Sequence, residues 1–184
     1  MEDYKNMKPK MIVYMAIFIA LGIVLPITFH YLGTGLGAIF LPMHIPVLLG
    51  GAFLGPLGGM IIGAVTPILS SIFTGMPPLI PMAPIMFLEL LIYGLTIGYF
   101  YHKQDFHLYI SLPVSMILGR IGAGLMVFIL VNIFNITKLP GNPLIYVWGT
   151  ITTGLPGIII QLILLPLVIN YLYNSTNIGM VKQN

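Results

Sequence analysis

Two residues of opposite charge, Glu89 and Arg120, interrupt long stretches of otherwise apolar sequence. A carboxylate and a guanidinium can pair through charge-assisted hydrogen bonds, and either can bind a polar group of a ligand. Ionisable side chains within apolar spans are costly, so a function is the default interpretation. A second interpretation is equally open: the two side chains form a buried ion pair that neutralises its own charges and binds no ligand.

The two charges are expected at the same depth of a membrane. A helix rises about 1.5 Å per residue. Glu89 then lies roughly 10–13 Å below the outer surface on a span that begins at Met82. Arg120 lies about 12 Å below that surface on the next, antiparallel span. The spacing therefore predicts that the two side chains can meet.

Other polar side chains concentrate in the same outer half of the predicted spans, with Gln161 as the main exception. The remaining candidates for a substrate site are His44, Ser70, Ser71, Asn132, Trp148 and Thr152. A pore or a proton relay would need polar groups across the full thickness, so this one-sided cluster favours a pocket that opens outward. Each residue also has an ordinary explanation, because Ser and Thr often bond to their own helix backbone and Trp is common at membrane interfaces.

Motifs of known enzymes are missing from the sequence. It holds no P-loop, no G-x-S-x-G elbow, no H-E-x-x-H and no cysteine. His102 and His107 lack a third ligand, so neither a metal site nor a cofactor is expected. An intramembrane hydrolase would have to use Ser70 or Ser71 with His44. Uphill transport would need a partner that hydrolyses ATP, or an ion gradient used by a secondary transporter for a small polar metabolite.

The charged residues are few and unevenly placed. Of 184 residues, 7 are Lys or Arg and 4 are Asp or Glu, while 58% are hydrophobic. The mean hydropathy is +1.04. Soluble domains are about 25% charged, and disordered chains need low hydrophobicity. Both classes are excluded, and the pattern indicates a multi-pass membrane protein.

Turns divide the apolar sequence into six predicted transmembrane helices, which form one all-α domain over residues 1–184. The predicted spans cover residues 11–29, 38–54, 59–73, 82–101, 108–134 and 144–173. The positive-inside rule places both termini in the cytoplasm. That side would carry Lys5, Lys8, Lys10, Lys103 and Lys182, against Lys138 alone on the other.

Small residues recur at four-residue spacing on several of these spans. The sets are Ala16 and Ala20, then Gly55, Gly59 and Gly63, and then Gly94 and Gly98. Small residues on one helix face let two backbones approach closely in lipid. We therefore expect close helix contacts at these positions.

Two stretches are similar to the substrate-binding S component of energy-coupling factor (ECF) transporters. The stretch Ala16–Ala20, with sequence AIFIA, matches the Ala-x-x-x-Ala docking motif on that family's first helix. Residues 46–59, with sequence PVLLGGAFLGPLGG, resemble its passage into the third helix. The chain length and the basic N-terminus also match.

This resemblance implies a subunit of an ATP-driven importer for a vitamin or vitamin precursor in the bacterial cell membrane. Ala16 and Ala20 would dock on an EcfT-like transmembrane coupling subunit, and two cytoplasmic ATPases would hydrolyse ATP. The outer loops 31–40, 74–81 and 137–143 would act as lids over an outward-facing pocket. Neither an enzymatic activity nor a nucleic-acid partner is expected. The candidate substrates are pantothenate, then a cobalamin-related compound such as α-ribazole, then a pyridoxine-like compound.

Overall fold

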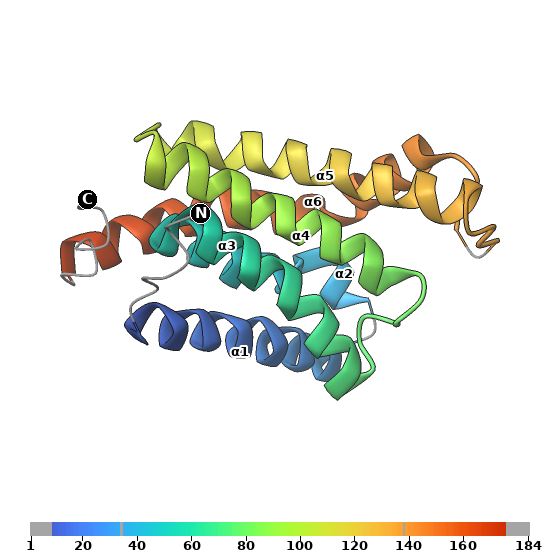
Figure 1. The fold of residues 1–184 in the computed structure, drawn as a ribbon, viewed down its shortest axis with the longest axis horizontal. Coiled ribbons are helices and arrows are strands. Elements are labelled where there is room, and N and C mark those ends of the chain that lie inside the picture. The colour runs from blue at the N-terminus through green and yellow to red at the C-terminus, as the bar shows by residue number, and fades with distance from the viewer. Residues whose placement is uncertain (1–8, 34, 138, 176–184) are drawn as a thin grey trace.

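Long helices pack side by side along one axis in the computed structural model, which describes residues 9–33, 35–137 and 139–175 (Figure 1). The elements are α1 (Pro9–Leu32), α2 (Leu36–Phe40), α3 (His44–Thr74), α4 (Met82–Ile97), the π-helix η2 (Gly98–Lys103), α5 (Leu108–Asn132) and α6 (Pro143–Ser175). No strand occurs among the described residues. The predicted all-α class is therefore confirmed for this part of the chain.

Five helical stretches of the described chain are long and apolar enough to cross a membrane. They cover residues 9–32, 36–74, 82–103, 108–132 and 143–172. The second stretch has 39 residues, far more than the roughly 20 that one crossing needs. It folds back on itself at Gly55, and so the predicted spans 38–54 and 59–73 become the two arms of a helical hairpin (Figure 1). A count of six crossings stays a prediction.

Gly55 makes this hairpin possible. Its φ of 76° and ψ of −174° lie in a region that side-chain-bearing residues rarely adopt. Pro56 follows it, and proline suits the first turn of the new helical arm. A Cβ placed on Gly55 would lie 3.0 Å from Cδ2 of His102, so the turn is also packed against the end of η2.

Glycines let α3 and α4 touch through their backbones, as their spacing predicted. A Cβ placed on Gly51 would lie 2.6 Å from the carbonyl oxygen of Gly94. A Cβ on Gly59 would lie 2.6 Å from the carbonyl carbon of Gly94, and one on Gly63 would lie 2.8 Å from the amide nitrogen of Leu91. These contacts fix the position of α4, which carries Glu89.

The core lies between α3, α4 and α5, and α1 and α6 flank it. Tyr93, Leu48, Ile62 and Leu112 are completely buried there. By contrast, large apolar side chains also face outward from these helices; Ile121 on α5, for example, is 62% exposed. An apolar exterior around an apolar core is what a lipid environment requires.

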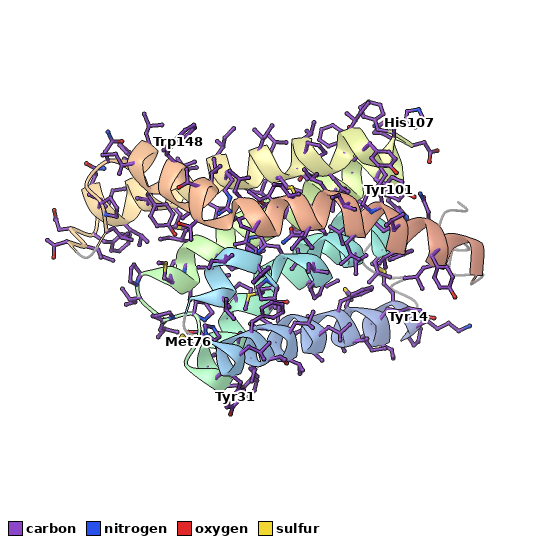
Figure 2. The ribbon with its side chains drawn as sticks, turned by 180° about the vertical axis from the view of Figure 1, so that it is seen from behind. Tyr14, Tyr31, Met76, Tyr101, His107 and Trp148 are labelled. Atoms are coloured by element: carbon purple, nitrogen blue, oxygen red, sulfur yellow. The ribbon has the colours of Figure 1, made fainter. Side chains whose placement is uncertain are left out.

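The two ends of the bundle carry different side chains (Figure 2). Tyr31, Met76 and Trp148 lie at one end, which we call the Met76 end, and Tyr14 and His107 lie at the other. Hence α1 begins at the end opposite Met76. Most of the lysines behind the predicted orientation (Lys5, Lys8, Lys138 and Lys182) lie outside the described residues. The cytoplasmic placement of the termini stays a prediction.

The helices depart from the predicted spans at two places. A break at residues 41–43, where Leu41 has a φ of 53°, separates α2 from α3 inside the predicted span 38–54. Pro42 accounts for it, because proline has no N–H to donate and disfavours a helical conformation in the residue before it. The predicted span 82–101 instead continues to Lys103 and ends in the π-helix η2.

Candidate substrate-binding site

Glu89 on α4 and Arg120 on α5 form an ion pair in the interior. Nη1 of Arg120 lies 2.8 Å from Oε1 of Glu89, and the two residues are only 7% and 3% exposed. The two side chains therefore meet, as the spacing in the sequence predicted. At this depth of burial, each charge is tolerated only because the opposite charge beside it compensates it.

His44, the first residue of α3, joins this pair from the other side. Its Nε2 lies 3.4 Å from the same Oε1 of Glu89. Its ring meets the ring of Tyr93 edge to face, with centroids 5.2 Å apart. Nδ1 is buried without a partner, so the tautomer that carries its proton on Nε2 leaves no buried N–H unpaired. His44, Glu89 and Arg120 are called the polar triad below.

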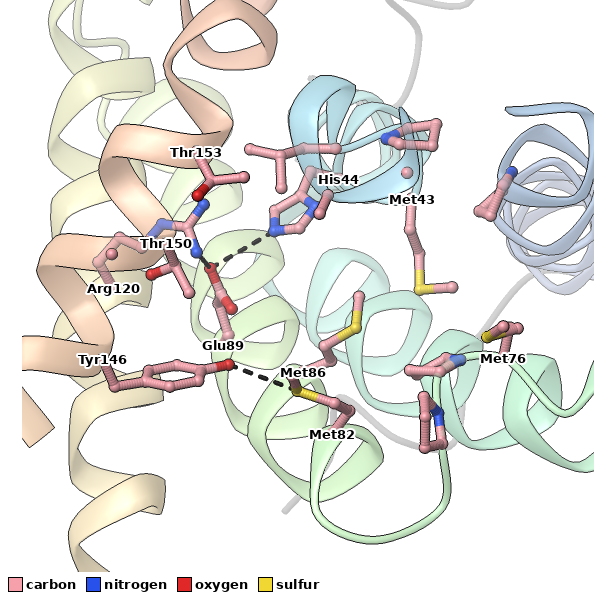
Figure 3. Close-up of a pocket in the computed structure, with 18 of the residues that line it drawn as sticks. Met43, His44, Met76, Met82, Met86, Glu89, Arg120, Tyr146, Thr150 and Thr153 are labelled. Atoms are coloured by element: carbon pink, nitrogen blue, oxygen red, sulfur yellow. Dashed lines mark hydrogen bonds and ion pairs between the residues drawn. The ribbon is translucent and has the colours of Figure 1, made fainter. Parts of the chain in front are cut away.

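The polar triad forms part of the wall of a cavity of about 590 Å³ (Figure 3). This volume falls in the range of small-molecule sites. Besides the triad, the cavity is lined by Pro26, His30, Gly37, Ala38, Leu41, Pro42, Met43, Met76, Pro77, Pro78, Met82, Met86, Pro140, Ile145, Tyr146, Gly149, Thr150 and Thr153. The expected lid loops 31–40, 74–81 and 137–143 all contribute to this lining.

Much of the remaining wall is apolar. Four methionines line it, namely Met43, Met76, Met82 and Met86. The hydroxyl of Tyr146 donates a hydrogen bond to the sulfur of Met82 over 3.6 Å, which fixes the tyrosine ring at the cavity edge (Figure 3). A few polar groups beside a large apolar surface are typical of small-molecule sites in general.

Trp148 and Thr152, the two candidates on α6, do not line the cavity. The adjacent face of the same helix lines it instead. Trp148 is 70% exposed, and Thr152 is exposed and donates to the Trp148 carbonyl of its own helix. Tyr146, Thr150 and Thr153 face the cavity instead. Residues three and four apart share a helix face, so choosing 148 and 152 from the sequence selected the adjacent face. Positions 146, 150 and 153 have helical spacing as well, so spacing alone could not distinguish the two faces.

The candidates Ser70, Ser71 and Asn132 also lie outside the cavity lining. Ser70 donates to the carbonyl of Met76 over 2.6 Å, and so holds a lining residue in place. The Ser71 hydroxyl is buried without a partner. Asn132 is exposed and donates to Phe128 of its own helix over 2.9 Å.

Neither serine bonds to His44 within the described chain, so the serine–histidine pair that a hydrolase needs is not formed there. Nor does any group of three or more His, Asp or Glu among the described residues stand close enough to hold a metal ion.

Gln161 on α6 supports the site from outside the cavity. Its side-chain nitrogen donates to the carbonyls of Phe40 and Leu41, over 3.4 and 3.2 Å. One turn earlier, a Cβ on Gly157 would lie 2.6 Å from the Phe40 carbonyl carbon. These contacts hold the break after α2, from which the chain enters α3 at His44. The sequence marked Gln161 only as the main exception to the polar cluster in the outer half of the spans.

Ala16 and Ala20 lie apart from this site, exposed on α1. That helix packs against α2 and α3, but only three of its residues, Met15, Gly22 and Pro26, are buried. The two alanines therefore leave a smooth face of α1 open to another apolar surface.

Five helical stretches that are long and apolar enough to cross a membrane, together with a cavity of ligand size, are typical of a multi-pass membrane protein with a site for a small molecule. The model of one family, ECF transporter, substrate-specific component, matches residues 10–169. The chain therefore belongs to that family, whose members are transport subunits, and the resemblance stated from the sequence is confirmed. Comparisons with curated proteins and with solved structures found no match.

Proposed function

We propose that this chain is the high-affinity substrate-binding subunit of an ATP-driven ECF importer for a vitamin or vitamin precursor. The observation that carries the proposal is the polar triad in the wall of an otherwise largely apolar cavity of about 590 Å³. The triad would orient the substrate through hydrogen bonds, and the apolar wall would supply most of the affinity.

The subunit would cross the bacterial plasma membrane six times, with both termini in the cytoplasm. The first crossing would be α1, and the two arms of α3, with α2 extending the first arm, would supply the next two. The cavity, at the Met76 end, would then face outward. His44, Glu89, Arg120, Thr150 and Thr153 would contact the substrate. Ser70 and Gln161 would act as positioning residues.

Import would need partners that bind elsewhere on the chain. An EcfT-like coupling subunit would dock on Ala16 and Ala20, and two cytoplasmic ATPases would supply the energy. Both alanines are exposed and neither lines the cavity, which fits such a division, because docking and substrate binding would then use different residues.

The test is uptake by proteoliposomes that contain this chain, its coupling subunit and both ATPases. Labelled pantothenate, α-ribazole and pyridoxine serve as substrates. We expect uptake of one of them to need internal ATP and every subunit, and to continue when an uncoupler removes the proton gradient. Uptake that collapses with the uncoupler at constant ATP would instead establish an ion-coupled secondary transporter, with Glu89 or His44 as the coupling group.

A further inference from the structure

The carboxylate of Glu89 offers one of its two oxygens to the cavity. Oε1 contacts both Arg120 Nη1 and His44 Nε2. Oε2 makes no hydrogen bond within the described chain, yet it is not among the buried atoms that lack a partner. Figure 3 shows it directed away from these two contacts. Oε2 is therefore a hydrogen-bond acceptor that a bound molecule can reach.

The guanidinium of Arg120 is not readily available to bind a substrate, although it carries a positive charge. Nη1 is already paired with Glu89, and Nε and Nη2 are buried without a partner. Because Nε and Nη2 are buried, an anionic substrate could pair with the guanidinium only by moving the Arg120 side chain. That movement would weaken the contact with Glu89 and leave a buried carboxylate uncompensated, which is strongly unfavourable. An anionic substrate would also face the negative Oε2. The site therefore disfavours carboxylates and phosphates.

The net charge of the triad disfavours cations as well. The charges of Glu89 and Arg120 cancel. His44 adds no charge in the form that carries its proton on Nε2 alone, and this form leaves no unpaired N–H on the buried Nδ1. A charged substrate of either sign would thus bring an uncompensated charge into a buried site. An uncharged O–H or N–H donor satisfies Oε2 without that cost.

The methionine wall indicates the rest of the molecule. Met43, Met76, Met82 and Met86 present flexible thioethers to the cavity (Figure 3). Thioether side chains adapt to irregular shapes and make favourable contacts with the edges of aromatic rings. A flat ring placed next to the triad would meet these side chains.

We infer that the substrate is an uncharged, ring-bearing molecule that donates an O–H or N–H to Oε2 of Glu89 and lays its ring against the methionine wall. The inference rests on the proposed function and narrows its substrate class. It places α-ribazole and pyridoxine, which have rings and hydroxyl groups and no net charge, ahead of pantothenate, an open-chain carboxylate.

Calorimetric titration of the purified full chain tests this with four probes: α-ribazole, pyridoxine, pantothenate and thiamine, which is a ring-bearing cation. We expect an uncharged ring compound to bind at least about tenfold tighter than the two charged probes, the cost of one poorly matched polar group. Tightest binding of pantothenate or thiamine would overturn the inference and leave the transport function standing.

If none of the four probes binds, the molecules released from the protein on denaturation decide the question. An uncharged ring compound with a donor group supports the inference, and a charged or ring-free compound overturns it. Release of no molecule at all would overturn the inference together with the proposed function.

Two variants test the geometry. Glu89→Asp keeps the charge that Arg120 needs but withdraws Oε2 by one methylene, so affinity should fall about tenfold or more. Met86→Ala removes part of the ring contact without touching the triad and should also weaken binding. Thr152→Val, outside the cavity, is the matched control and should bind as the parent chain does. Unchanged affinity in both Glu89→Asp and Met86→Ala, with folding verified by thermal unfolding, would contradict the inference.

Discussion

Arg120 Nη1 and Glu89 Oε1 lie 2.8 Å apart in the interior of the bundle, and the same oxygen also faces His44 Nε2. The two interpretations that the sequence left open, an ion pair and a cavity wall, therefore describe one arrangement. The pair compensates its own charge while leaving Oε2 of Glu89 open to the cavity.

Replacing one member of the pair should be worse for stability than replacing both. Glu89→Ala or Arg120→Ala leaves a buried charge alone, which costs about 3–5 kcal/mol. The double variant Glu89→Leu, Arg120→Met removes both charges and should unfold at a temperature closer to that of the parent chain. Thermal unfolding in detergent measures this, and equal losses in the single and double variants would contradict it. The double variant should still lose substrate affinity; if it binds normally, the pair serves structure alone.

The cavity face of α6 should matter for binding, and its neighbouring face should not. Thr150→Val and Thr153→Val each remove a hydroxyl from the lining and should weaken binding by about 0.5–1.5 kcal/mol. Thr152→Val removes the same atom from an exposed position and should leave binding unchanged. Calorimetry on the three purified variants compares them. If Thr152→Val weakened binding as much as the other two variants, the site would have been assigned to the wrong face of α6.

Gln161 should act on the substrate through the break after α2. Gln161→Leu keeps a similar volume but cannot donate to the Phe40 and Leu41 carbonyls, so the segment that enters α3 at His44 should be less well held. We expect weaker binding and unchanged assembly with the coupling subunit. Gln161→Glu offers no donor when ionised and should behave alike. Full affinity in both variants would show that these hydrogen bonds are dispensable.

Docking should depend on the smooth face of α1. Ala16→Trp and Ala20→Trp add bulk to exposed positions and should abolish co-purification with the coupling subunit, while substrate binding stays intact. Ile121→Trp, at an exposed position on α5, is the control for added bulk. The docking assignment would be refuted if Ala16→Trp or Ala20→Trp lost substrate binding. It would also be refuted if both variants still co-purified with the coupling subunit.

The glycine contact between α3 and α4 should be intolerant of any side chain. Gly63→Ala would press a methyl group into the backbone at Leu90 and Leu91, and should lower the unfolding temperature and weaken binding by displacing Glu89. Gly149→Ala meets nothing within 4 Å and should be neutral or stabilising, because alanine favours helix. Similar unfolding temperatures for the two variants would contradict the close packing.

Helix geometry and the placement of charges were sufficient to predict the regular helices of the fold and one contact between them. The rise per residue predicted the meeting of Glu89 and Arg120, and the gap between the predicted spans 38–54 and 59–73 predicted where the chain turns. The break at residues 41–43 was missed, although Pro42 marked it, because the surrounding residues are apolar enough to read as one span. Nothing in the sequence distinguished η2 from an ordinary last turn.

The cavity lining was harder to predict, because it depends on how each helix is rotated. Threonines occur on two adjacent faces of α6, at positions 150, 152 and 153, and their types alone do not show which face turns inward. The four methionines of the cavity wall could not be recognised from the sequence, because they carry no polar group that stands out in an apolar span. Gln161 could be recognised as unusual, but its partners at Phe40 and Leu41 are about 120 residues away in the chain.

Native mass spectrometry of the purified chain, after incubation with extract of the source cells, tests the central claim most directly: a small molecule occupies the cavity beside the polar triad. We predict an added mass of one small molecule per chain, released on denaturation. Met86→Trp, which fills the cavity, should abolish this added mass, and Ile117→Trp, at an exposed position on α5, should retain it. No added mass on the parent chain, or an added mass that persists in Met86→Trp, would contradict the account.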